Sequence, residues 1–173
     1  MSLAKISTLA DAVASTISTA WNPSAPSAVT RLYGEDISLS PDIVETLVSG
    51  RQLFVLPVDF SQPEIVTRNE AKRRYTVGVI VVERDTSTGD NGIPSNAWMD
   101  TRIAFVEAVF NLVANPFSAL GSAGNFQPDD SCEFETLYDR DLYLKYRTFF
   151  SVMVFNFIEI QTIPGNVSFA GIS

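Results

Sequence analysis

Apolar residues recur at every third or fourth position near the start of the chain, with polar residues between them. This is the spacing of an amphipathic helix, and the residues that show it are Ile6, Ala10, Val13, Ile17 and Ala20. The helix should end at Trp21, because Asn22 precedes a proline and such a residue avoids the helical conformation. A second helix is expected from about Ser95 or Ala97 to Ala114. Its apolar positions extend so far around the helix that we expect most of its circumference to be buried.

Five segments have the β-branched and aromatic content of strands: residues 28–34, 52–60, 74–84, 133–138 and 146–161. Pro57 indicates an edge position or a bulge in the second of them. Both faces of 74–84 are apolar, which predicts a central strand covered on both sides. The last segment is long for a strand, so it either bends or extends past its own sheet toward a neighbour. We expect residues 61–73 to be a polar connection and 40–48 to be a short helix or an irregular segment.

The order of these segments predicts an α+β fold with a mixed, mostly antiparallel sheet, on which an N-terminal helix and a central helix pack. A chain of 173 residues is the size of one domain. We place that domain at 1–162 and expect 163–173 to be a flexible C-terminal tail. No apolar run approaches the roughly 18 residues that a membrane helix needs, so we expect no membrane partner.

The composition excludes several kinds of chemistry. The chain has no histidine, which removes histidine-based triads, proton shuttles and metal ligands. Cys132 is the only cysteine and is interpreted as an apolar filler in a strand. Twenty acidic against twelve basic residues give a net charge of −8, whereas a free-standing nucleic-acid binder needs surplus cations. We expect no catalytic site, no metal and no cofactor.

Two short segments carry opposite charge. Residues 129–141 hold six acids against one arginine, and a basic segment lies within 68–74. Solvated loops are the ordinary explanation of such runs; the other is a head-to-tail contact between identical subunits, steered by complementary charge. The candidate partner-contact residues are Arg68, Lys72, Arg73, Arg74, Asp129, Asp130, Glu133, Asp139 and Asp141.

The order of four motifs resembles a known family. A basic lead-in and strand (TRNEAKRRYTVGVIVV, 67–82) precede a helix (DTRIAFVEAV, 100–109), and an acidic-aromatic stretch (LYDRDL, 137–142) precedes a final strand (TFFSVMV, 148–154). Over roughly residues 3–161 this resembles the tail terminator, or tail-completion, proteins of long-tailed bacteriophages. Residues 21–60, with their prolines, depart from the family pattern.

The resemblance implies a structural protein of the virion, assembled in the host cytoplasm, that is not an enzyme and binds no cofactor. Six subunits would form a ring that ends polymerisation of the tail tube and joins the tail to the head. Its partners would be further copies of itself, the tail tube protein and the head–tail connector or stopper protein, with DNA only passing through the lumen. The alternatives are a head–tail adaptor or stopper of the neck, a carboxylate-dependent hydrolase, and a soluble binding module unrelated to phages.

Overall fold

A computed structural model of the chain describes residues 5–21, 28–33, 50–67, 69–85, 94–115, 120 and 126–162. The elements, in chain order, are α1 (Lys5–Trp21), β1 (Val29–Arg31), β2 (Arg51–Phe60), β3 (Glu64–Thr67), β4 (Glu70–Arg84), α3 (Asn96–Val113), β5 (Phe126–Pro128), β6 (Glu133–Thr136), α4 (Arg140–Tyr146) and β7 (Thr148–Thr162). The predicted α+β class is confirmed. Our expectations for 40–48 and for the tail at 163–173 lie outside the described residues, as does Arg68.

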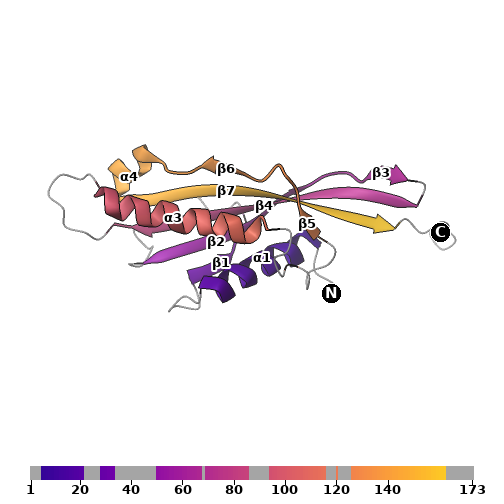
Figure 1. The fold of residues 1–173 in the computed structure, drawn as a ribbon, viewed down its shortest axis with the longest axis horizontal. Helices are drawn as coiled ribbons and strands as arrows, with labels where there is room; N and C mark the ends of the chain where they lie inside the picture. Colours follow the sequence, from indigo (N-terminus) through magenta and orange to yellow (C-terminus); the bar gives the residue numbers. More distant parts are fainter. Residues whose placement is uncertain are drawn as a thin grey trace.

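The centre of the sheet is a long antiparallel pair, β4 and β7, matched over 15 residues from Glu70 opposite Thr162 to Arg84 opposite Thr148. The strand order is β1-β2-β4-β7-β5, with β3 added to β4 and β6 added to β7. Only β1 and β2 pair in parallel, so among the described strands the sheet is mixed and mostly antiparallel, as predicted. Figure 1 shows the long pair running along the longest axis of the molecule.

Helices α1 and α3 cover one face of this sheet (Figure 1). Leu9, Val13 and Ile17 of α1 are fully buried against alternating strand residues such as Val77 and Val79. Removing this much apolar surface from water is the main favourable contribution to folding. Of the positions in the predicted spacing, Ala10, Val13 and Ile17 are buried and Ile6 is half-buried, whereas Ala20 is exposed. The spacing therefore identified the middle of the buried face of α1.

Helix α3 is less buried than its composition predicted. Of its residues only Val106, Val109 and Val113 are buried, while Phe105 is half-buried. The expectation that most of the circumference is covered was wrong, because α3 lies on the outside of the sheet and turns only one side to it. An apolar hollow of about 340 Å³ is left between α1 and α3, lined by Ile17, Ala20, Trp21, Phe105, Ala108, Val109 and Leu112.

The second face of the sheet has its own smaller apolar cluster. Leu56, Ile80, Val82 and Phe150 are buried there, and Leu142 of α4 packs against them. All residues of β4 from 77 to 83 are buried, so the prediction that this strand is covered on both sides holds for its second half. The first half, at 70–76, is more exposed.

Pro57 lies where both sequence expectations placed it. The pairing of β2 with β4 shifts register between Pro57 and Asp59, which is a bulge. The parallel pairing with β1 ends at Val55, so on the side away from β4 no described strand pairs with β2 at the proline, which has no N–H to donate.

Three elements were missed by the sequence patterns: β3, the three-residue strand β5 and the helix α4. Residues 61–73, predicted to be a polar connection, contain β3 and the start of β4, which form an antiparallel hairpin. Residues 140–146 form the short helix α4, where the sequence patterns predicted only the start of the strand at 146–161. Asp139 caps this helix by accepting a hydrogen bond from the Leu142 backbone N–H at 2.9 Å, and Arg147 ends it in the left-handed conformation, with φ of 51°.

Candidate interaction surface

One end of the sheet extends past both α1 and α3 (Figure 1). We call this end the arm; it consists of residues 58–60 of β2, β3, residues 70–74 of β4 and residues 158–162 of β7. Because β4 and β7 remain paired to the end of β7, the long strand at the C-terminus does not extend past its sheet alone. In the arm, β7 stays paired with β4, and β4 pairs with β3.

The arm exposes large apolar side chains. Those of Val58, Phe60, Ile65, Val66 and Ile160 are each at least 55% exposed. All four residues of β3 are exposed, and no described strand pairs with its outer edge. Natural proteins usually protect such an edge with proline or lysine, and β3 contains neither. A group of exposed apolar side chains beside an unpaired strand edge is typical of a surface that binds another protein chain.

The predicted basic residues 72–74 lie on the arm, on alternating faces of β4. Lys72 and Arg74 are on the face turned away from α1 and α3, where they line a hollow of about 220 Å³ together with Ser61, Gln62 and Glu64. Arg73 is on the other face, and its guanidinium lies 5.8 Å from the centre of the Phe60 ring. The basic segment is therefore divided between two faces of the sheet.

The predicted acidic residues lie at the opposite edge of the sheet, on β6 and the residues around it. Asp130, Glu133 and Asp141 are exposed there, whereas Asp139 is engaged as the cap of α4. Asp129 forms an ion pair with Arg74 of the same chain. The structure thus brings one acid and one base of the two segments together within the chain and keeps the remaining acids at the far edge.

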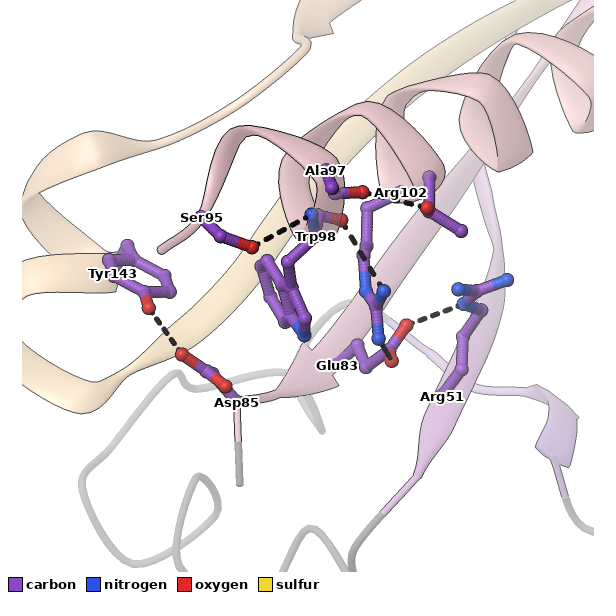
Figure 2. A network of polar contacts seen from close by, with 9 residues as sticks. Arg51, Glu83, Asp85, Ser95, Ala97, Trp98, Arg102 and Tyr143 are labelled. Atoms are coloured by element: carbon purple, nitrogen blue, oxygen red, sulfur yellow. Dashed lines mark hydrogen bonds and ion pairs between the residues drawn. The ribbon is translucent and has the colours of Figure 1, made fainter. Parts of the chain in front are cut away.

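Sequence reasoning missed three buried carboxylates, of which Glu83 is the first. It accepts a hydrogen bond from Arg51 of β2 at 2.6 Å and another from Arg102 of α3 (Figure 2). Ser95 caps α3 by accepting from the Trp98 N–H at 3.2 Å, and the Arg102 guanidinium stacks 4.2 Å from the centre of the Trp98 ring. Glu83 therefore ties the end of β4 to β2 and to the first turns of α3.

Asp85 is the second buried carboxylate. Its Oδ2 accepts from the Tyr143 hydroxyl, which Figure 2 shows pointing at it, and from Arg147 at 3.1 Å. Burial and the neighbouring Asp85 charge raise the pKa of Tyr143 to about 12, because both disfavour the phenolate. This contact fastens α4 to the end of β4.

Glu159 is the third, and it lies where the arm begins. Its carboxylate accepts from Lys5 of α1 at 2.7 Å, from the Tyr75 hydroxyl at 3.0 Å and from the Gln161 amide. Burial alone would raise the pKa of Glu159, but the hydrogen bonds from Lys5, Gln161 and Tyr75 outweigh it and hold the pKa below its usual value. The network fixes the first turn of α1 to β7.

Cys132 differs slightly from its predicted place. It precedes β6 rather than lying within a strand, and it packs half-buried against the main core. Its thiol approaches the Asn156 carbonyl at 3.6 Å. Burial raises the pKa of this thiol, so the reactive thiolate is disfavoured.

Within the part of the chain that the structure describes, no group of three or more histidine, cysteine, aspartate or glutamate residues is placed to hold a metal ion. None of its helices is both long enough and apolar enough to span a membrane. No protein-family model and no curated protein sequence matches the chain.

Proposed function

We propose that this protein is a structural subunit of a bacteriophage tail. In this proposal six copies form a ring at the head-proximal end of the tail. The ring ends polymerisation of the tail tube and joins the tail to the head connector, with DNA passing through its lumen. The phage assignment rests on the order of sequence motifs, and the arm supports assembly into a ring.

The observation that carries the proposal is the exposed apolar end of the sheet. Ile65 is 74% exposed on a strand whose outer edge faces no described strand. Leaving such side chains and backbone groups in water makes a chain prone to uncontrolled pairing, and covering them in an assembly removes that liability. A subunit that functions only within an assembly explains why the arm is left uncovered.

The arrangement of charge favours a ring over a two-fold dimer. The basic residues Lys72 and Arg74 lie toward one edge of the sheet, while the exposed acids lie at the other. Different patches that complement each other produce head-to-tail contacts, which close into a ring when the rotation between subunits permits. The net charge of −8 also suits a ring around DNA, because like charge favours passage over adhesion.

Two measurements test the proposal. Light scattering and negative-stain microscopy of the purified protein should show six-membered rings, and particles assembled without the protein should carry overlong tails. Particles with tails of normal length and leaking heads would assign the protein to the neck as a stopper instead. A chain that stays monomeric at every concentration and in the presence of tail tubes would contradict the proposal.

A further inference from the structure

We propose that the hollow on the arm receives the acidic strand β6 of a second copy of this chain, so that the carboxylates of Glu133 and Glu135 lie against Lys72 and Arg74. This inference rests on the proposed ring and names the contact that would close it.

The hollow suits a carboxylate. Two of the side chains that line it are cations and one, Glu64, is an acid. Arg74 already shares its charge with Asp129, whereas Lys72 forms no ion pair with any described residue. Ser61 Oγ accepts a hydrogen bond from the Arg74 backbone N–H at 3.0 Å, which leaves the hydroxyl hydrogen for an incoming acceptor. Charge-assisted hydrogen bonds of this kind are roughly twice as strong as neutral ones.

Strand β6 can supply that acceptor. Glu133 and Glu135 are both exposed, and no described strand pairs with the outer edge of β6. Between them, Phe134 turns toward α3, where its ring stacks on Phe110 at a centroid distance of 4.5 Å. Without Asp129, which Arg74 already pairs, residues 130–141 hold five acids against one arginine, a net charge of −4, so a basic partner suits this edge.

The position of the two surfaces favours a second copy over a contact within one chain. Glu133 lies opposite Val154 of β7, and Lys72 lies opposite Ile160 of the same strand. Both partner positions are even-numbered, and side chains alternate between faces along a strand, so the two charged groups share the face turned away from α1 and α3. They lie at opposite edges, because β3 adds to β4 and β6 adds to β7. Glu133 and Lys72 are also six residues apart along β7, so one copy must shift sideways across the sheet and by roughly 20 Å along the strands to bring the two together.

Each charged surface also has exposed apolar neighbours. Val66, two residues after Glu64 on β3, is exposed, and exposed Leu137 follows β6. Ile65 lies opposite Ala71 and therefore on the other face of the sheet from the hollow. An apolar centre with a polar border is the usual composition of a specific protein interface. In such a contact the charges set partner choice and register, and the apolar groups exclude water around them.

The test is a charge exchange between Lys72 and β6, measured by sedimentation at several protein concentrations and salt concentrations. Lys72 is chosen over Arg74 because changing Arg74 would also break its ion pair with Asp129. We expect Lys72→Glu to raise the protein concentration needed for assembly about tenfold or more at low salt, equivalent to about 1.4 kcal/mol. Joining it with Glu133→Lys and Glu135→Lys should restore assembly. The matched controls are Arg84→Glu, at the other end of the same strand, and Glu107→Lys on α3, both at exposed positions.

A cross-linking experiment tests the same contact with Lys72 unchanged, so the inference does not depend on the Lys72→Glu variant alone. In a Cys132→Ser background, cysteines placed at Glu64 and Glu133 should join neighbouring copies into a ladder that ends at the ring size, since a disulfide needs Cβ atoms roughly 4 Å apart. Rings that give no ladder and assemble normally with Lys72→Glu would overturn this inference and leave the ring standing. A wild-type chain that never assembles would overturn both the ring and the contact with β6. A Lys72→Glu defect seen only in binding to tail tubes would assign the hollow to the tube protein and overturn this inference.

Discussion

Arg74 of β4 and Asp129, which follows β5, form an ion pair within one chain, with Nη2 and Oδ2 3.0 Å apart. The Arg74 side chain is half-exposed, so water and salt screen the attraction, and exposed pairs typically contribute 1 kcal/mol or less. We expect Asp129→Asn to lower the free energy of unfolding in urea by about 0.5 kcal/mol. Asp130→Asn, at the exposed neighbouring position, is the control and should change it less. A loss of about 3 kcal/mol, the size seen for buried pairs, would contradict this account.

Glu83 should matter far more to stability. It is 9% exposed and held between two arginines, so Glu83→Gln would leave two poorly hydrated guanidinium groups without a counter-charge. We expect a loss of about 3 kcal/mol in the free energy of unfolding, measured by denaturant titration, against a negligible change for Glu107→Gln at an exposed position of α3. Adding Arg102→Met to Glu83→Gln should cost less than the sum of the two single changes, because the groups interact directly. Strict additivity would show that the pair is not coupled.

The Glu159 network predicts a loss of stability in acid. Its pKa is lower in the folded chain than its usual value, so the unfolded state binds the proton more readily. The stabilisation from Glu159 is therefore present above the usual glutamate pKa of about 4.3 and is lost as the pH falls through the folded value. Unfolding free energies measured from neutral pH down to about 3 should fall less steeply for Glu159→Gln than for the wild type. Parallel curves would refute the assignment.

Tyr143 predicts the opposite behaviour in alkali. Its pKa of about 12 lies above the usual tyrosine value of about 10, so its contribution is complete below about pH 10 and is lost as the pH rises toward about 12. Tyr143→Phe should remove this part of the alkaline dependence. In the folded wild type, absorbance of the phenolate should show Tyr143 ionising later than an ordinary exposed tyrosine. A phenolate step near pH 10 that is present in the wild type and absent from Tyr143→Phe would contradict the proposed contact with Asp85.

The thiol of Cys132 provides a local measure of folding. Because burial raises its pKa, we expect a thiol reagent to modify it slowly in buffer and rapidly in urea, where the thiolate forms more readily and is accessible. Cys132→Ser supplies the blank for the assay. Equal rates in the two conditions would show that the segment before β6 opens freely in the native protein.

Local patterns were sufficient where an element has a repeating face of its own. The apolar spacing of α1 and the aromatic and β-branched content of β7 each identified the element and, for α1, its buried side. The same reasoning failed for β3, because a strand with all four residues exposed has no alternation of burial to detect. It failed for α4 because seven residues are too few to establish a helical period, although Asp139 three residues before Leu142 is a capping signal that could have revealed it.

The candidate surface was predictable only as a set of charged residues. Composition located the basic and acidic segments, but it could not show that Arg73 and Arg74 turn to opposite faces, that Asp129 is already paired, or that Ile65 is left exposed beside them. The sequence could not indicate the partners of the buried carboxylates either, since Glu159 and Lys5, for example, are 154 residues apart.

By itself, the amino-acid sequence determined the α+β class, the two long helices and the main strands, because helices and strands each repeat their buried positions with a characteristic period. Its composition also excluded chemistry that depends on histidine or on a second cysteine. Only the tertiary structure decided which charges neutralise one another, which apolar residues remain uncovered on the arm, and how far α3 is buried. Those outcomes depend on the strand register and the packing that bring distant residues together, and the local periodicity of the sequence contains no information about either.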